Sequence, residues 1–220
     1  MKKIAQPASL SDQAYNIIKE QILTGKLQDN DALPEEKLAS QLGISRTPLR
    51  NALLRLSSEG LIVQRKGEPA RVASFTKENS LEYMEIRSLL EIYNIEKIVT
   101  KIDDKFVHLL EENLAEQAEA IADGTYNDFI EKDREFHLLL ASYSGNNELK
   151  KMIKKMNTGV NRAFIILSKT VPQSAQSAYE EHADIIKALK AKDTVVAKNT
   201  MHLHLANVEK RFLEGMKLDK

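Results

Sequence analysis

Four residues of metal-binding type interrupt apolar helical stripes in the second half of the chain: Asp133, His137, His182 and His204. The first two are four residues apart and share one face of a helix, and both later histidines lie at helical spacing from apolar neighbours. Because an unpartnered charge or imidazole in a core costs several kcal/mol, a shared partner is expected. One carboxylate oxygen and three imidazole nitrogens suit a divalent metal, with positions left for water or a ligand. We predict zinc, with nickel and manganese as alternatives.

Each of these residues also has a simpler interpretation. A single histidine in a core is usually just hydrogen-bonded, and an aspartate–histidine pair four residues apart is common on exposed helices as a weak surface pair. The two remaining histidines, His108 and His202, fall off the apolar stripes, and we expect both to be solvated. The metal interpretation therefore depends on the same anomaly recurring in three separate segments.

The segments that must position these residues have the periodicity of helices. From residue 78 onward the pattern is helical throughout, and short polar or glycine- and proline-containing breaks divide it. The composition agrees, because 8 Gly and 5 Pro among 220 residues are few. We expect an all-α, antiparallel bundle of six helices, at about residues 78–101, 104–122, 126–143, 147–169, 174–190 and 193–214.

A second pattern, from Pro34 to Ile62, predicts two short helices around a Gly43–Ile44 turn. Pro34 suits the first turn of a helix, and Ser45 suits the N-cap of the next one. Apolar residues recur at helical spacing in both segments and leave the opposite face of the second helix free. That face carries side chains suited to base edges and phosphates, namely Arg46, Thr47 and Arg50.

Two short strands, at residues 61–64 and 70–73, are expected after this motif, around a turn marked by Gly67 and Pro69. A helix capped by Ser9 or Ser11 would precede the motif as its scaffold. The fold class is therefore mainly α: a winged helix-turn-helix domain at residues 1–75, then an all-helical domain at residues 76–220.

Charge separates the two parts, although the net charge of the chain is zero. Residues 1–75 hold eleven Lys or Arg against eight Asp or Glu, a net charge of +3, and the remainder holds 21 against 24, a net charge of −3. A basic module joined to an acidic one suits a protein of which only the first part meets nucleic acid. The chain has no cysteine, no apolar leader and no run that approaches a membrane span, so we expect a cytoplasmic protein.

The motif E-x-x-LA-x-x-LG-I-S-R-T-P-L-R-x-A-L-x-x-L-x-x-E-G-L-I resembles the winged-helix domain of GntR-family bacterial transcription regulators. Two departures from that family are Asp29-Asn30, where Pro-Gly is usual, and Asn51, where Glu is usual. The resemblance implies that the hairpin is a wing over the adjacent minor groove. The residues expected to contact DNA are Ser45, Arg46, Thr47, Arg50, Asn51, Lys66 and Gly67.

The pattern Asp133-x-x-x-His137, Ser144-Gly145-Asn146, Glu181-His182 and Met201-x-x-His204-Leu205 resembles the FCD effector domain of the FadR subfamily. In that family the aspartate and three histidines bind a divalent metal, and a small carboxylate effector completes its coordination. Six helices suggest the shorter, VanR-like form. Arg87 matches a further signature, and it could pair with an effector carboxylate or equally with Glu91 on its own helix.

We therefore expect a homodimeric regulator, by family default a repressor, that binds a palindromic operator and responds to a small organic acid. Dimerisation follows because one recognition helix covers only half a site. The competing class is a metal-dependent hydrolase, since a metal with open positions activates water. It lacks a glutamate base beside the motif and leaves the DNA-binding domain unexplained. A regulator that senses the metal itself, or a purely structural role for the four residues, would also account for the pattern.

Overall fold

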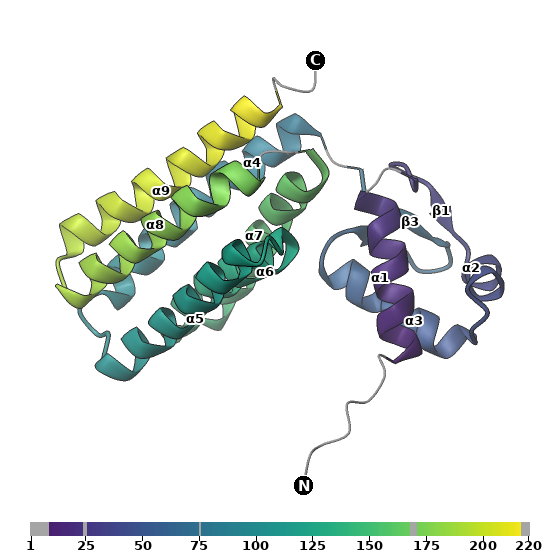
Figure 1. Ribbon diagram of the computed structural model, residues 1–220, viewed down its shortest axis with the longest axis horizontal. Helices are drawn as coiled ribbons and strands as arrows, with labels where there is room; N and C mark the ends of the chain where they lie inside the picture. Colours follow the sequence, from purple (N-terminus) through teal and green to yellow (C-terminus); the bar gives the residue numbers. More distant parts are fainter. Residues whose placement is uncertain (1–8, 24–25, 75, 168–170, 217–220) are drawn as a thin grey trace, which may run out of the picture. The chain divides into compact units, whose positions relative to one another are not determined.

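The chain forms two compact units, Met1–Phe75 and Thr76–Lys220, each of which is considered by itself (Figure 1). The computed structural model describes residues 9–23, 26–74, 76–167 and 171–216. The predicted fold class is confirmed, because the first unit is a winged helix-turn-helix and the second is all helical. Of the helices described, none has both the length and the apolar character needed to cross a membrane.

The described residues of the first unit form three helices and a small sheet. Its core forms where α3 packs on α1, with the apolar stripe of α3 fully buried between them. Gly43 ends α2 in the left-handed region at φ 64°, and Ser45 caps α3 with extended backbone but without a side-chain cap bond. The elements are α1 (Leu10–Leu23), β1 (Ala32–Leu33), α2 (Glu35–Leu42), α3 (Arg46–Ser58), β2 (Ile62–Val63) and β3 (Ala70–Val72).

The sheet has three antiparallel strands in the order β1-β3-β2, and only the two strands of the wing were predicted. The additional strand, β1, pairs Ala32 with Arg71 and Leu33 with Ala70. With two residues it is too short for an alternating pattern, so sequence periodicity carries no signal for it. Leu33 is 1% exposed, and this strand therefore ties the loop before α2 to the core of the unit.

In the second unit, the residues that the structure describes form the six predicted helices. Two begin at aspartate caps: Asp103 accepts a hydrogen bond from the Phe106 N–H, and Asp193 accepts from the N–H groups of Val195 and Val196. The fifth helix begins earlier than expected, at Val171, whereas its expected range began at about residue 174. Proline is tolerated in the first turn of a helix, which explains the difference. The helices are α4 (Lys77–Ile98), α5 (Asp104–Ala122), α6 (Tyr126–Tyr143), α7 (Asn147–Leu167), α8 (Val171–Lys190) and α9 (Thr194–Gly215).

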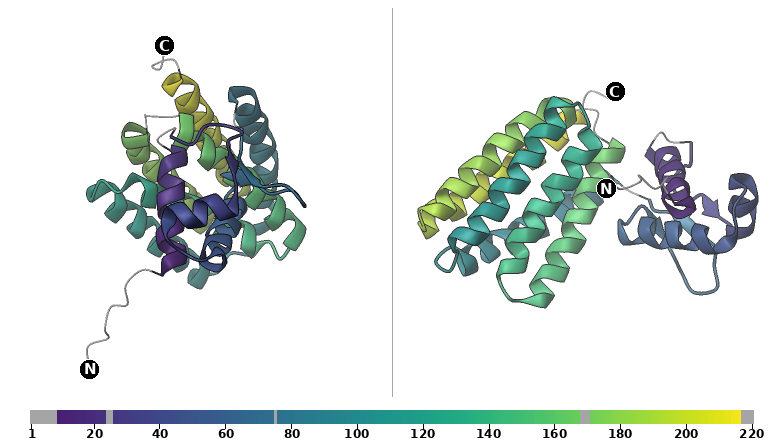
Figure 2. Two further views of the ribbon diagram at one scale, coloured as in Figure 1. Left: turned by 90° about the vertical axis from the view of Figure 1, so that its right-hand side faces the viewer. Right: turned by 60° about the horizontal axis from the view of Figure 1, so that its bottom comes forward.

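The six helices lie side by side in a closed bundle (Figure 2). Their main contacts follow the order α4, α7, α6, α5, α8, α9 and back to α4, and α6 also contacts α4 and α8. One end of the interior is a conventional apolar core around Ile95, Phe136 and Leu189. The interior also holds fully buried polar residues, which an apolar core would exclude unless they are bonded to one another. Those polar residues form the candidate site.

Candidate functional site

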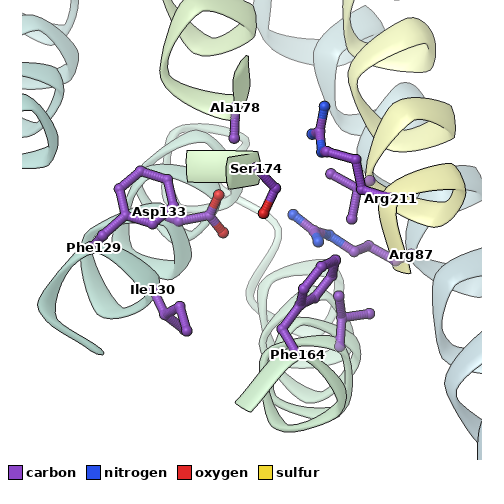
Figure 3. A pocket seen from close by; sticks show the side chains of 10 residues that line it. Arg87, Phe129, Ile130, Asp133, Phe164, Ser174, Ala178 and Arg211 are labelled. Carbon is purple, nitrogen blue, oxygen red and sulfur yellow. The ribbon is translucent and has the colours of Figure 1, made fainter. Parts of the chain in front are cut away.

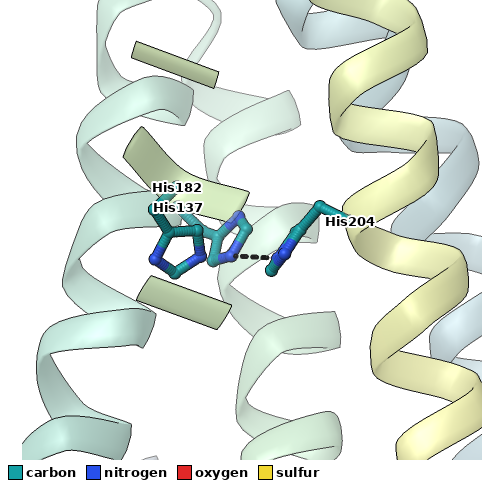
Figure 4. A group of neighbouring side chains, drawn as sticks. All are labelled: His137, His182 and His204. Atoms are coloured by element: carbon teal, nitrogen blue, oxygen red, sulfur yellow. Dashed lines mark hydrogen bonds between the residues drawn. The ribbon is translucent and has the colours of Figure 1, made fainter. Parts of the chain in front are cut away.

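Three histidines from three helices meet inside the bundle, as predicted from their positions on apolar stripes (Figure 4). His137 on α6, His182 on α8 and His204 on α9 are each at most 1% exposed. One nitrogen atom from each ring lies within 4.8 Å of the others. Asp133 lies at the edge of this histidine cluster, with its Oδ1 atom 3.5 Å from Nε2 of His182.

The outer nitrogen of His137 is held by a buried carboxylate. His137 Nδ1 lies 2.5 Å from Glu91 Oε2, and Glu91 Oε1 accepts hydrogen bonds from Arg87 Nε at 2.7 Å and Asn157 Nδ2 at 3.0 Å. Burial raises the pKa of Glu91, but the charges of His137 and Arg87 outweigh it and hold this pKa well below its usual range. Because an ionised carboxylate only accepts hydrogen bonds, His137 must carry a proton on Nδ1.

His204 is held in the same way by Glu181. Its Nδ1 atom lies 2.8 Å from Glu181 Oε2, and Arg211 donates two hydrogen bonds to the same carboxylate at 2.7 and 2.8 Å. Asn207 donates a further one at 2.8 Å. Burial raises the pKa of Glu181, but the hydrogen bonds from Arg211 and His204 outweigh it and lower this pKa to about 2. His204 therefore also carries its proton on Nδ1.

His182 is oriented by a chain of two amides instead of a carboxylate. Its Nδ1 atom lies 2.8 Å from Gln117 Oε1, Gln117 Nε2 donates to Asn113 Oδ1 at 2.8 Å, and Asn113 Nδ2 donates to the Lys132 carbonyl at 3.1 Å. A backbone carbonyl can only accept, so it fixes the orientation of the Asn113 amide, which in turn fixes that of Gln117. His182 must therefore donate from Nδ1, as His137 and His204 do.

The three inner Nε2 nitrogens therefore face one another inside the bundle. The Nε2 atoms of His137 and His204 are 3.3 Å apart, and Nε2 of His182 has no hydrogen-bond partner among the described residues. Burial lowers the pKa of His182 well below its ordinary value and lowers that of His204, so their neutral forms are favoured. Converging imidazoles with second nitrogens held by acceptors are the arrangement found around bound metals. The residues present thus fit a divalent cation, and imidazole ligands suit zinc or nickel.

A pocket of about 430 Å³, including its opening to solvent, adjoins the cluster (Figure 3). Arg87, Asp133 and Arg211 reach into it, and the guanidinium of Arg87 and the carboxylate of Asp133 point toward the same space. Arg87 Nε binds Glu91, one of the two partners expected for this arginine, and its buried Nη2 has no partner among the described residues. The apolar residues of the wall are Phe129, Ile130, Val160, Phe164, Ala178 and Val208.

Sequence reasoning missed the residues that support the histidines. A signal existed for two of them, because Asn113 and Gln117 interrupt the apolar stripe of α5 in the same manner as the histidines interrupt theirs. Glu181 and Arg211 gave no such signal, since charged residues beside an apolar stripe are ordinary on a helix surface. Glu181 can hold His204 only because α8 packs on α9, which brings Glu181 to Arg211, a residue 30 positions later in the sequence.

The residues predicted to contact DNA all lie exposed in the first unit. Five lie at the start of α3, and Lys66 and Gly67 lie in the turn between β2 and β3, where Gly67 adopts φ 84°. Two of the arginines already have acidic partners on α2: Arg46 lies 3.0 Å from Glu36, and Arg50 lies 2.7 Å from Glu35. Both pairs are exposed, so each contributes at most about 1 kcal/mol and can be exchanged for contacts to DNA.

A winged helix-turn-helix unit joined to a helical unit with a polar interior site defines a transcription regulator with an attached helical domain. Comparison of the sequence with family models supports this class of protein. Residues 10–72 match the family described as bacterial regulatory proteins, gntR family, and residues 82–207 match the FCD domain. The chain therefore belongs to the GntR family of bacterial transcription regulators, in the FadR-like group that carries an FCD domain.

Individual relatives are consistent with this assignment. The chain is 29% identical over 203 residues to the HTH-type transcriptional regulator YdhC of Bacillus subtilis, covering 92% of this chain and 90% of that one. It is 28% identical to the Exu regulon transcriptional regulator of Escherichia coli, covering 94% and 86%. Among solved structures, E. coli McbR/YncC aligns with a TM-score of 0.69 at 26% identity, covering 97% and 99%. These curated relatives are transcriptional regulators and not enzymes, which agrees with the family assignment and does not support the hydrolase alternative.

Proposed function

We propose that this protein is a dimeric, metal-containing transcription regulator that changes its affinity for a palindromic operator when a small organic acid binds in the helical unit. One observation carries the proposal: three imidazoles converge on one point beside a pocket that contains a buried guanidinium nitrogen with no partner among the described residues. The cluster suits a cation and the guanidinium suits an anion. A site that sensed the metal alone would not need the unpaired guanidinium nitrogen of Arg87.

In the proposed metal site, His137, His182 and His204 hold the cation through Nε2, and Asp133 supplies a carboxylate oxygen. Zinc is the first candidate, with nickel or manganese as alternatives. The metal supplies a Lewis-acidic centre that polarises and orients an oxygen ligand. The residues of the chain fix the ring tautomers, exclude most solvent and place Arg87 beside the open side of the cluster.

In the proposed DNA complex, the exposed N-terminal turns of α3 enter the major groove and the wing contacts the adjacent minor groove. Arg46, Thr47, Arg50 and Asn51 would read base edges, while Ser45, Lys66 and Gly67 would contact the backbone. One α3 helix covers half a site, so a two-fold symmetric dimer is needed to bind a palindrome with useful affinity. Repression is the activity we propose for the bound dimer.

An effector can change DNA affinity only if it binds one arrangement of the dimer more tightly than the other. The metal cluster and pocket belong to the second unit, so the effect does not arise from competition for the groove. By linkage, operator DNA must change effector affinity by the same factor as effector changes DNA affinity, typically about 5- to 150-fold.

The test combines elemental analysis with operator titration. Purified protein should contain about one divalent ion per chain, because one set of three histidines and an aspartate binds one zinc ion. His182→Ala and His204→Ala should lose it, keep operator binding, and lose the response to a panel of small carboxylates. His108→Ala is the matched control, because His108 is exposed and its ion-pair partner in the described structure is Glu112. Variants that remain folded by circular dichroism and still respond would show that the cluster is not the sensor.

A further inference from the structure

We infer that the effector is a monocarboxylate with a compact apolar body, and that polyhydroxylated acids and dicarboxylates are selected against. This inference rests on the proposed function, because it specifies the acid that the pocket beside the histidine cluster binds. It depends on three properties of the described pocket wall: the arginine nitrogens that can bind an anion, the sum of the charges around the pocket, and the apolar side chains of the lining.

Among its described residues, the pocket offers one buried cationic donor that has no hydrogen-bond partner. Arg87 is 2% exposed, Nε is committed to Glu91, and Nη2 has no partner. A buried donor left unbonded costs about 1 to 3 kcal/mol, so a ligand oxygen at this atom recovers that cost. Arg211 also lines the pocket, but it binds Glu181 through two nitrogens at 2.7 and 2.8 Å, so a second ligand carboxylate there would compete with Glu181.

The charge balance around the pocket also favours one carboxylate over two. The carboxylates of Asp133, Glu91 and Glu181 contribute three negative charges, and Arg87 and Arg211 contribute two positive charges. With a divalent cation at the histidine cluster the sum is one positive charge. A monoanion neutralises it, whereas a dianion leaves an excess negative charge in a site of low dielectric beside Asp133.

Most of the remaining wall is unsuited to hydroxyl groups, although the hydroxyl of Ser174 points into the space between Asp133 and Arg87 (Figure 3). Phe129, Ile130 and Phe164 lie on one side of the space that Arg87 enters, and Val160, Ala178 and Val208 complete the apolar lining (Figure 3). Each ligand hydroxyl turned toward such a wall loses its hydrogen bonds to water without replacement. An alkyl or aryl group there loses nothing and gains about 25 cal/mol for each Å² of apolar surface removed from water.

The experiment measures binding of matched probes to zinc-loaded full-length protein by isothermal titration calorimetry. Benzoate, benzamide, gluconate and succinate differ in charge or polarity. Benzoate should bind about tenfold or more tightly than gluconate and succinate, and benzamide should lose binding because it brings no charge to Arg87. Val208→Thr should weaken benzoate several-fold, because it places a hydroxyl in the wall. Val196→Thr, on the exposed face of the same helix, should not.

Each different outcome contradicts a definite statement. If gluconate or succinate binds more tightly than benzoate, the inferred ligand class is wrong and the proposed function remains. Equal binding of benzamide would show that the carboxylate does not meet Arg87. If the protein holds metal but binds none of these acids, both the inferred class and the proposed organic-acid response are wrong. If it takes up no metal, the proposed metal site itself is rejected.

Discussion

The side chains of Gln117 and His182, 65 residues apart in the chain, meet through a 2.8 Å contact between Oε1 and Nδ1 that decides which histidine nitrogen faces the cluster. The Asn113 amide and the Lys132 carbonyl fix the direction of this contact. Without it, His182 is free to carry its proton on Nε2. A proton there would occupy the position that a metal requires.

Replacing Gln117 by Leu should therefore weaken metal binding while leaving the protein folded. Loss of a hydrogen-bond partner behind a metal-binding histidine typically costs about 10- to 100-fold in metal affinity. Gln176→Leu is the control, because Gln176 is exposed and bonds to Glu180 in the described structure, away from the histidines. Nitrogen-15 NMR of the histidine rings in metal-free protein should show a shift of the His182 proton from Nδ1 to Nε2. An unchanged tautomer in Gln117→Leu would contradict this role.

Arg50→Ala should weaken specific operator binding by about 1 to 3 kcal/mol if the arginine reads a guanine. In the structure, Arg50 is 2.7 Å from Glu35, an exposed pair that contributes at most about 1 kcal/mol. We therefore expect Arg50 to gain free energy when it leaves Glu35 and forms a bidentate contact with a base. Gel-shift titration of folded Arg50→Ala and Arg46→Ala proteins tests the assignment. Full operator affinity in both variants would rule out α3 as the reading helix.

Lys66→Ala should produce a smaller and different effect, because the turn between β2 and β3 is expected to contact phosphate. Affinity should fall for specific and unrelated DNA alike. The slope of log affinity against log salt concentration should become shallower by about 0.9, because one phosphate fewer is neutralised by the protein. Fluorescence anisotropy at several salt concentrations measures this slope. A loss restricted to the operator sequence would instead indicate base recognition by the wing.

Gly159→Ala should destabilise the second unit through the packing of α7 on α4. An added Cβ at Gly159 would lie 2.7 Å from the nearest ring carbon of Tyr83, and overpacking of this kind costs about 1 to 3 kcal/mol. The effect of Gly159→Ala on the free energy of unfolding should change sign when the Tyr83 ring is removed. In a Tyr83→Ala background the same change should stabilise by up to about 1 kcal/mol, because alanine is the better helix former. Urea unfolding of the four proteins measures both values, and destabilisation in both backgrounds would show that the tyrosine is not the cause.

The sequence by itself determined the helix-turn-helix, the wing hairpin and the six helices of the second unit. These features depend on signals that lie within one segment, such as apolar periodicity, the Gly43 turn and the aspartate caps. It also singled out the three histidines, since a polar residue on an apolar stripe is visible without knowing its partner. The short strand β1 was not predicted, because two residues are too few to show an alternating pattern.

Only the tertiary structure decided how those histidines act together. That His137 is bonded to Glu91, His182 to Gln117 and His204 to Glu181 depends on which helices are neighbours in the closed bundle. Periodicity tells which face of a helix is buried but not which helix covers it, because any apolar face can pack against another. The choice among these arrangements is made by the packing of side chains from several helices at once, and it sets the tautomers on which metal binding depends.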